Sequence, residues 1–347
     1  MNDDTRLREG LEACASPSRS VAAATANGVY AALDLGTNNC RLLIASPAGD
    51  SFRVVDSFSR IIRLGEGISA TGSISEAAID RAIAALSICS DKIRYRKAHR
   101  LRLIATEACR AAANADSFRA RVAVETGIRL EVIDRETEAT LAVIGCSPLL
   151  DAKGRGAILF DIGGGSTELV RIERDPARYN AAPRIKAWMS IPLGVVTLAE
   201  HFGGRDVTAE SYARMVREVA QYVAPFAAQH GTDLHDMHML GTSGTVTTLA
   251  GVHLNLARYD RRRIDGIWMN GSDVTTVIQR LRGMSYQERA NNNCISVERA
   301  DLVLAGCAIL DAIRDAFPLQ RLRVADRGLR EGMLVEMMRE DGALNIR

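Results

Sequence analysis

One short segment combines glycines, hydroxyls and two carboxylates in an order that suits a metal–phosphate complex. It reads Asp161-Ile162-Gly163-Gly164-Gly165-Ser166-Thr167-Glu168. The three glycines carry no Cβ, so the backbone can approach a ligand closely and its N–H groups can converge on phosphate oxygens. Ser166 and Thr167 add hydroxyl donors, while Asp161 and Glu168 offer the hard oxygen ligands that Mg²⁺ prefers. The alternative is a tight hairpin turn capped by Asp161, but carboxylates on both flanks favour the metal and phosphate site.

The same order of strand, aspartate, glycine turn and strand occurs once earlier in the chain. That copy reads Asp34-Leu35-Gly36-Thr37-Asn38-Asn39-Cys40-Arg41. Aligning the aspartates aligns Gly36 with Gly163 and places Arg41 where the later copy has Glu168. The earlier copy therefore predicts an anion cradle, with Asp34 as a further candidate metal ligand. Two unrelated hairpins are the alternative. However, the two copies are separated in the sequence by about the length of a domain, which favours a duplicated domain with a ligand between the halves.

A third glycine-rich turn, Gly241-Thr242-Ser243-Gly244, lies between an expected strand near 237–240 and an expected helix after Gly244. The N-terminus of a helix attracts anions through its unpaired N–H groups and its macrodipole. The same residues are also ordinary loop chemistry. We therefore keep all four as candidate phosphate ligands beside the alternative of a plain connection.

Two charged residues on other segments could complete a reaction at a bound phosphate. Glu138 lies in a helix expected over 136–144, where its carboxylate could act as a general base toward water. Arg110 follows a strand expected over 101–106 and could clamp a phosphoryl group with its planar guanidinium. From residue physics alone, a surface glutamate in a first helical turn and a solvated arginine are the commoner cases.

Length and composition narrow the class of protein. A chain of 347 residues exceeds one ordinary hydrophobic core and predicts two domains. Aromatic residues at 5% and a formal charge of +2 argue against a nucleic-acid partner. No apolar run reaches the roughly 20 residues that span a bilayer, so we expect no membrane association. The odd set of 7 cysteines without a Cys-x-x-Cys pair favours free thiols in a reducing cytoplasm.

The remaining patterns alternate between helix and strand, which predicts an α/β fold. Residues 1–28 are expected to form a loose tail. A capping box at Ser73-Ile-Ser-Glu76 predicts a helix start. Further expected elements are a helix near 117–126, a strand near 129–134, and helices near 208–228, 272–282, 297–315 and 328–339.

Two basic clusters, at 92–100 and 258–263, could line a path for an extended polyanion, although solvated faces are the commoner outcome. His235 and His238 lack a third spaced ligand, so a zinc site is not expected.

Together the motifs resemble those of the exopolyphosphatase and guanosine pentaphosphate phosphohydrolase family, a branch of the actin, Hsp70 and sugar kinase superfamily. The likeness covers nearly everything after the tail, and the string at 161–168 is its most specific part. The other motifs are Asp34-Leu-Gly-Thr-Asn-Asn, Ala105-Thr-Glu-Ala-Cys-Arg110, Thr137-Glu138-Ala, Gly241-Thr-Ser-Gly-Thr and Gly328-Leu-Arg-Glu-Gly332.

This resemblance implies two ribonuclease-H-like, actin-like ATPase domains that flank an interdomain cleft. The first would span 29–139 and be completed by a C-terminal helix at about 327–347, and the second would span 140–326. It also implies Mg²⁺, or another divalent cation, and removal of terminal phosphate from linear polyphosphate or from pppGpp, which gives ppGpp. The chain resembles the short form, without the C-terminal helical region of longer members.

By matched motif position, the resemblance assigns Glu138 to the proposed base and Arg110 to the phosphate-binding arginine. It assigns Asp161, Gly163 and Glu168 to the metal and phosphate site. The sequence departs from the family pattern at three positions: Thr37 replaces the usual serine, Thr137 replaces the first of two common glutamates, and Glu107 replaces a frequent small polar residue. None removes a proposed catalytic group, but Glu107 could alter the charge near Arg110.

The expected reaction is attack of water on a terminal phosphorus, with Glu138 as base and with Mg²⁺, the loop N–H groups and Arg110 stabilising the developing charge. One alternative is a phosphotransferase of the same superfamily. Another is a non-catalytic sensor that binds (p)ppGpp or a nucleotide. The choice between polyphosphate and pppGpp, the preferred chain length and the oligomeric state, a homodimer included, stay open at this point.

Overall fold

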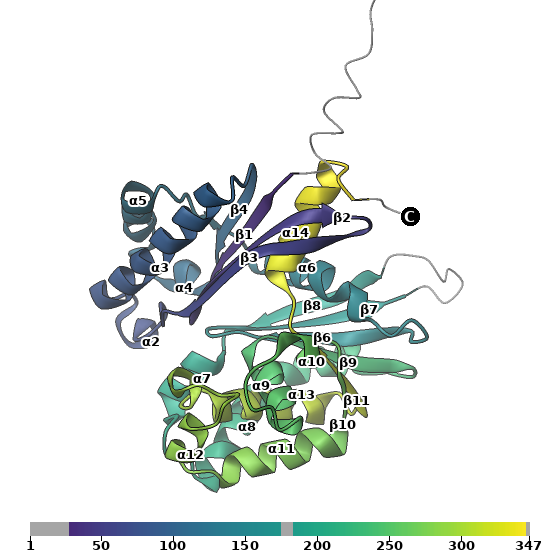
Figure 1. The fold of residues 1–347 in the computed structure, drawn as a ribbon. Helices are drawn as coiled ribbons and strands as arrows, with labels where there is room; N and C mark the ends of the chain where they lie inside the picture. The colour runs from purple at the N-terminus through teal and green to yellow at the C-terminus, as the bar shows by residue number, and fades with distance from the viewer. Residues whose placement is uncertain (1–27, 175–182, 345–347) are drawn as a thin grey trace, which may run out of the picture.

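The computed structural model describes residues 28–174 and 183–344 and arranges them around two β-sheets (Figure 1). The first sheet has the order β3-β2-β1-β4-β5 and the second β10-β11-β9-β6-β7-β8. The strands of the first sheet are β1 (Tyr30–Leu35), β2 (Asn39–Ala48), β3 (Ser51–Ile61), β4 (Arg100–Ala105) and β5 (Glu131–Val132). Those of the second are β6 (Gly156–Ile162), β7 (Thr167–Glu173), β8 (Arg184–Ile191), β9 (Met237–Thr242), β10 (Trp268–Asn270) and β11 (Arg321–Ala325).

The two sheets repeat one topology. In the first, β1, β2 and β3 form an antiparallel meander, and β4 and β5 add in parallel beside β1. In the second, β6, β7 and β8 form the meander, β9 and β11 add in parallel beside β6, and β10 closes the edge in antiparallel. This repeated order is that of a ribonuclease-H-like domain, so the predicted duplicated α/β fold is confirmed.

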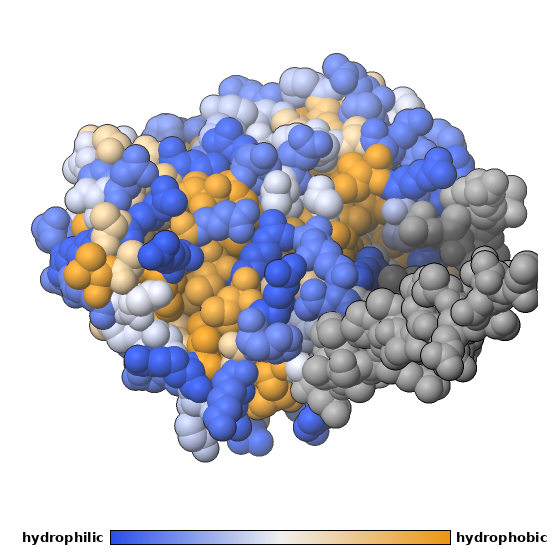
Figure 2. Space-filling model, turned by 90° about the horizontal axis from the view of Figure 1, so that it is seen from above, coloured by the Kyte–Doolittle hydropathy of each residue, from blue (hydrophilic) through white to orange (hydrophobic). Residues whose placement is uncertain are grey.

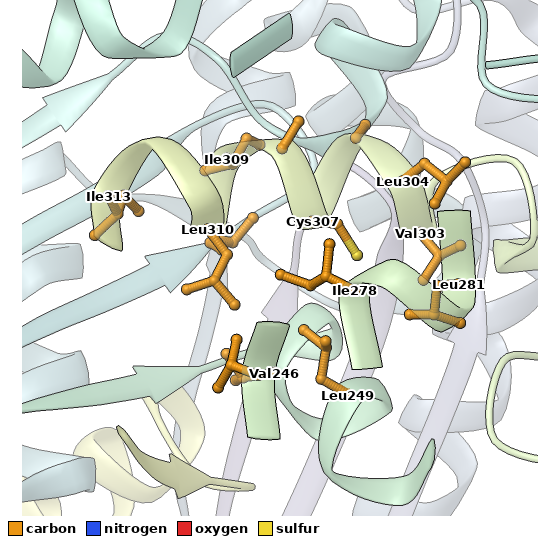
Figure 3. Packing of buried hydrophobic residues seen from close by; sticks show 14 of the residues in the cluster. Val246, Leu249, Ile278, Leu281, Val303, Leu304, Cys307, Ile309, Leu310 and Ile313 are labelled. Atoms are coloured by element: carbon orange, nitrogen blue, oxygen red, sulfur yellow. The ribbon is translucent and has the colours of Figure 1, made fainter. Parts of the chain in front are cut away.

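Helices cover both sheets and also fill the space between them (Figure 1). The outer face of the first sheet packs on α3 (Glu76–Tyr95), α4 (Glu107–Ala111) and α5 (Ala115–Thr126). The outer face of the second packs on α7 (Val195–Phe202), α8 (Ala209–His230), α9 (Gly244–His253), α11 (Gly271–Gly283) and α13 (Val303–Ala316). Figure 3 shows part of this layer, where Cys307 and Leu310 of α13 lie on the side of Ile278 of α11 and Val246 of α9.

The middle layer contains α6 (Arg135–Cys146) and α14 (Leu329–Glu340), whose apolar residues form one cluster with the inner faces of both sheets. Two glycines allow these helices to pack very closely. A Cβ on Gly145 would lie 2.0 Å from the Gly328 carbonyl oxygen, and a Cβ on Gly332 would lie 2.1 Å from the Leu141 carbonyl oxygen. Because Glu138 lies on α6, this contact with the C-terminal helix sets its position.

Successive side chains of a strand point to opposite faces of its sheet, and this alternation directs the aspartates of both hairpins toward the middle layer. Tyr30 and Ala32 of β1 belong to the middle cluster, and so do Ala157 and Leu159 of β6. Side chains two residues apart lie on one face of a strand. The aspartate that follows each pair therefore points from its sheet toward the space between the sheets.

Most of the expected elements are present with shifted ends. The helix expected after Ser73 begins at Glu76, and its cap is Ser75, whose Oγ accepts from the Ala78 N–H at 3.3 Å. The expected capping box is therefore wrong, because the serine in extended conformation directly before the helix is Ser75. The strand expected over 129–134 shrinks to the two residues of β5. The helix expected over 297–315 is divided into a 3₁₀ turn, η2 (Val297–Arg299), and α13.

The short connecting helices are α2 (Ile68–Thr71), η1 (Ser147–Leu149), α10 (Arg261–Ile264) and α12 (Tyr286–Ala290). Helix α6 runs without a break across residues 139 and 140, so the division of the chain at that point stays a proposal. The tail expected at 1–28 lies outside the described residues except for Gly28. The face seen from above carries hydrophobic patches between hydrophilic residues (Figure 2). No helix in 28–174 or 183–344 is both long and apolar enough to cross a bilayer.

Candidate active site

The two predicted hairpins have the same local geometry. In the first, the Gly36 N–H donates to the Asn39 carbonyl oxygen at 2.9 Å, and Asp34 lies opposite Arg41. In the second, the Gly163 N–H donates to the Ser166 carbonyl oxygen at 2.9 Å, and Asp161 lies opposite Glu168. Directly opposite residues of an antiparallel pair have Cβ atoms about 5 Å apart. Each hairpin therefore presents a pair of charged side chains at the end of its sheet.

The tips of the two hairpins touch each other. A Cβ on Gly164 would lie 2.9 Å from Thr37 Cβ, and a Cβ on Gly165 would lie 2.8 Å from Thr37 Oγ1. The main chain at Gly194 closes the other side, because a Cβ there would lie 2.4 Å from the Gly164 carbonyl carbon. These glycines are thus required by contacts within the protein, a reason that differs from the close approach of a ligand expected from the sequence.

Buried carboxylates dominate the second hairpin. Glu168 is 2% exposed and accepts hydrogen bonds from Ser166 Oγ at 2.8 Å and Ser190 Oγ at 2.9 Å. Burial raises the pKa of Glu168. Burial and the neighbouring Glu168 also raise the pKa of Asp161, to about 7, although Arg41 opposes this shift. Burial raises the pKa of Asp34 as well. The site thus concentrates negative charge in a poorly solvated space, where a cation would stabilise it.

Arg110 and Glu138, which are far apart in the sequence, form an ion pair in the structure. The Arg110 guanidinium donates to Glu138 Oε2 at 2.8 Å, to Glu107 Oε2 at 3.0 Å and to the Ile133 carbonyl oxygen at 2.8 Å. Glu107 also binds Arg135 at 2.9 Å. Glu107 therefore shares the charge of Arg110, as its position in the sequence suggested.

The environment of Glu138 favours a basic carboxylate. Its side chain is only 13% exposed. Burial and repulsion by Glu168 raise the pKa of Glu138 well above its ordinary value, while Arg110 opposes the shift. A carboxylate whose pKa lies nearer to neutrality is a more effective general base. The mutual influence of Glu138 and Glu168 also places α6 beside the second hairpin.

The third glycine turn adjoins the second hairpin, since Thr242 is the β-sheet neighbour of Asp161. Its hydroxyl groups are used within the protein. Thr242 Oγ1 donates to the Arg327 carbonyl oxygen at 2.6 Å, and Ser243 Oγ donates to the Ile162 carbonyl oxygen. Thr167 Oγ1 likewise donates to the Leu193 carbonyl oxygen at 2.8 Å. In this turn the main-chain N–H groups at the start of α9, rather than the hydroxyls, are the better candidates for a phosphate contact.

Two arginines near the hairpins were not singled out in the sequence. Arg299 Nη1 lies 3.3 Å from the position of a Cβ on Gly244, at the start of α9. Burial lowers the pKa of Arg299, and the charge of Arg41 lowers it further. Burial and the charge of Arg41 also lower the pKa of Arg330, which lies in the motif at 328–332. Arg330 could have been proposed as a site residue from the sequence, because its motif was recognised. No local sequence pattern marks Arg299.

The first basic cluster and the histidine pair lie outside this group, whereas the second cluster adjoins it, since the charge of Arg41 reaches Tyr259. In the first cluster, Lys92 and Arg96 both bind Asp56, at 2.8 Å and 2.9 Å. In the second, Arg261 binds the buried Glu331 at 2.7 Å. These cations neutralise acidic neighbours. His235 is exposed beside Asp236, and His238 is buried near Trp268.

The residues present fit a divalent cation held jointly by protein and substrate. Among the described residues, no three His, Cys, Asp or Glu side chains are grouped so as to hold a metal by themselves. Mg²⁺, however, commonly binds through one or two carboxylates, waters and substrate phosphates. Asp161 and Glu168 supply such carboxylates. Asn38 Oδ1 and Asn39 Oδ1 are buried acceptors without a hydrogen-bond partner among the described residues, and acceptors of this kind suit metal-bound water.

The raised pKa of Asp161 predicts how stability depends on pH. The folded protein retains a proton at Asp161 up to about pH 7, whereas the unfolded chain releases it near pH 4. The stability contributed by this proton is complete below pH 4 and is lost as the pH rises through 7. Without metal, the contribution of Asp161 to the free energy of unfolding should fall by up to about 3 kcal/mol between pH 5 and 8.

Denaturant unfolding of metal-free protein at several pH values measures this dependence. In the Asp161→Asn variant, the free energy of unfolding should change less with pH than in the wild type. The Asp50→Asn variant, changed at an exposed turn residue, should match the wild type. A wild-type free energy that rises between pH 5 and 8, or an unchanged slope in Asp161→Asn, would contradict the assignment.

Comparison with known proteins agrees with this arrangement. Residues 43–341 match the Ppx/GppA phosphatase family. The chain belongs to this family. It is 30% identical over 321 residues to exopolyphosphatase 2 of Mycobacterium tuberculosis, an alignment that covers 88% of this chain and 98% of the relative. It is 29% identical to the guanosine-5'-triphosphate,3'-diphosphate pyrophosphatase of Photobacterium profundum, over 89% of this chain but 59% of that protein.

Solved structures of Ppx/GppA proteins share the fold. The Aquifex aeolicus family member has a TM-score of 0.74 at 28% identity, and the match covers 90% of this chain and 98% of that one. An exopolyphosphatase-like protein has a TM-score of 0.81 at 26% identity, with 90% and 99% covered. The chain therefore spans nearly all of these two-domain Ppx/GppA structures, but only about 60% of the pyrophosphatases that it matches.

Proposed function

We propose that this Ppx/GppA protein hydrolyses phosphoanhydrides and releases terminal orthophosphate from linear inorganic polyphosphate, with pppGpp as the second candidate substrate. The M. tuberculosis relative supports polyphosphate, because the alignment covers 98% of that exopolyphosphatase. The pyrophosphatases support pppGpp less strongly, because the alignment covers only 59% of the Photobacterium profundum protein. A phosphotransferase and a non-catalytic (p)ppGpp sensor remain the alternatives.

One observation carries the proposal. The partly buried pair of Glu138 and Arg110 lies beside the carboxylates of the second hairpin, close enough for Glu168 to raise the pKa of Glu138. A binding protein has no need of a basic carboxylate next to a phosphate site, since that carboxylate repels the ligand. A hydrolase needs such a group to take a proton from water.

The residues then have separate tasks. Glu138 accepts a proton from a water molecule as its oxygen attacks the terminal phosphorus. The bridging P–O bond breaks, and its electron pair leaves with the shortened chain. Arg110 and the main-chain N–H groups of the hairpins stabilise the charge on the transferred phosphoryl oxygens. Mg²⁺, held by Asp161 and Glu168 with Asp34 nearby, would neutralise phosphate charge when bound.

Other phosphate ligands fall into two groups in this proposal. The first hairpin contributes Gly36, Thr37, Asn38, Asn39 and Arg41. The second hairpin and third turn contribute Gly163, Gly164, Gly165, Ser166, Thr167, Gly241, Thr242, Ser243 and Gly244. The domain division at 29–139 and 140–326, a homodimer, and a cytoplasmic location also belong to the proposal. The buried free thiols of the described cysteines support the location, since such thiols are usual in a reducing compartment.

The test compares substrates under one condition. Purified protein with Mg²⁺ is incubated separately with short polyphosphate, long polyphosphate and pppGpp, and orthophosphate is measured. We expect release from polyphosphate at a higher kcat/KM than from pppGpp. Release from pppGpp alone would contradict the preferred substrate, and background release from all three would contradict hydrolysis. Binding of pppGpp without release would then identify a sensor.

A further inference from the structure

Two arginines, a tryptophan and a histidine form a group on the second sheet, away from the hairpins of the candidate active site. It consists of Trp268 on β10, Arg321 and Arg323 on β11, and His238 on β9. Along β9, His238 is separated from Thr242 by four residues, or roughly 13 Å at the usual rise of a strand. His238 and Arg321 are therefore remote from the hairpin tips, whereas Arg323, opposite Leu240, lies two positions along the sheet from Thr242.

Strand pairing brings both arginines onto one indole ring. Trp268 lies directly opposite Arg323, and Arg321 lies two residues away on the same face of β11. The guanidinium carbons of Arg321 and Arg323 lie 3.9 Å and 4.7 Å from the centre of the Trp268 ring. The His238 ring approaches edge-on at 5.1 Å. The indole is thus covered by two guanidinium groups and by His238, whose pKa burial lowers to about 4 so that the ring is neutral near pH 7, and it is a poor platform for a base.

The guanidinium of Arg323 contacts no carboxylate of the described residues, although Asp151 and Asp265 lie near enough to attract it. The nearby Asp265 binds Arg327, and Asp151 lies 3.3 Å from Arg321. Among the described residues, Arg323 makes no ion pair within 4.0 Å, and its buried Nε has no hydrogen-bond acceptor. His238, 3% exposed, also has an unpartnered Nε2.

Stacking on Trp268 alone would account for one arginine, since cation–π contacts stabilise a cation over an aromatic ring. It accounts less well for two, because like charges on one ring repel each other. Burial lowers the pKa of Arg323, Asp151 and Asp265 oppose this shift, and repulsion by Arg321 adds to it. An anion between the guanidinium groups would remove this repulsion and satisfy the free donors.

We propose that Arg321, Arg323 and His238 form a second anion site that binds phosphoryl groups independently of the catalytic cleft. Guanidinium forks match the oxygens of phosphate with two parallel hydrogen bonds. Because the ring of Trp268 is already covered, the site recognises phosphate rather than a base. Condensed inorganic phosphate and nucleoside triphosphates both carry this chemistry, and the site should bind them equally.

Trp268 itself reports binding, since the chain has 2 tryptophans. In a Trp188→Phe background, Trp268 is the single emitter. Sodium tripolyphosphate is titrated in EDTA, with NaCl at matched ionic strength as reference. We expect a saturable change in emission that NaCl does not reproduce. Arg323→Gln should raise the half-saturation concentration roughly tenfold or more, because charge-assisted hydrogen bonds are lost. Arg321→Ala should also raise it.

Matched variants separate this site from the active site. Arg41→Ala, in the first hairpin, should leave the change in Trp268 emission intact, and circular dichroism confirms that each variant is folded. A missing signal, a signal that NaCl reproduces, or one that persists unchanged in folded Arg323→Gln would overturn the proposal. Loss of the signal in Arg41→Ala would overturn it too, because the response would then originate in the cleft. A tenfold preference for GTP over tripolyphosphate would contradict recognition by phosphate alone.

Discussion

Replacing Glu138 with Gln is expected to lower the rate of orthophosphate release by about 10²–10⁴-fold, the usual contribution of a general base. Glutamine keeps the shape of the side chain and can still accept from Arg110, but it cannot take a proton from water. Because Glu138 is proposed to act on the water rather than to bind the chain, KM should change little while kcat falls. Steady-state kinetics with polyphosphate of one length measures both constants.

The matched control lies two residues away on the same helix. Glu136 is exposed in the first turn of α6, so Glu136→Gln removes an equal charge without touching the site and should retain wild-type kcat. Equal activity of Glu138→Gln and wild type would remove Glu138 from the mechanism. A lower kcat in both variants would instead indicate that the substitutions disturb helix α6 itself.

Replacing Arg110 with Ala is expected to lower kcat/KM by about 10²–10³-fold, comparable to the loss of one donor to a developing oxyanion. It also leaves Glu138 and Glu107, which both bind this guanidinium, without their cation. Because Arg110 holds the pKa of Glu138 down, its loss should raise that pKa further. The acid limb of the kcat profile should then move to higher pH.

Arg110→Lys and Arg129→Ala refine the result. Lysine restores the charge but not the forked geometry, so it should return the pH profile toward wild type while recovering only part of the rate. Arg129 is exposed on the neighbouring loop, and its replacement by Ala should change neither the pH profile nor the rate. A pH profile of Arg110→Ala that coincides with wild type would contradict the coupling between Arg110 and Glu138.

The hairpins could be predicted from the sequence because their information is local. Alternation of apolar residues sets which way Asp34 and Asp161 point, and the glycines mark the turns between strands. The pairings of Asp34 with Arg41 and of Asp161 with Glu168 follow from the same spacing. Family resemblance supplied the candidate roles of Glu138 and Arg110, which local physics had favoured as surface residues.

Other features depend on contacts that no local pattern contains. Gly164 and Gly165 are needed because the tip of the first hairpin occupies the space beside them. Gly332 is needed because α14 crosses α6 at close range. Arg299 is the last residue of the 3₁₀ turn η2 and reaches α9 only through the packing of the helices on the second sheet. Each of these is a consequence of how distant segments meet.

The most direct test of the central claim follows the oxygen of water. Polyphosphate is hydrolysed by the wild-type protein with Mg²⁺ in heavy-oxygen water, and the products are analysed by mass spectrometry. Attack of water on the terminal phosphorus predicts that each released orthophosphate carries one solvent-derived oxygen and that the shortened chain carries none. Heavy oxygen in the shortened chain, or release that requires an added acceptor and leaves orthophosphate unlabelled, would contradict the account.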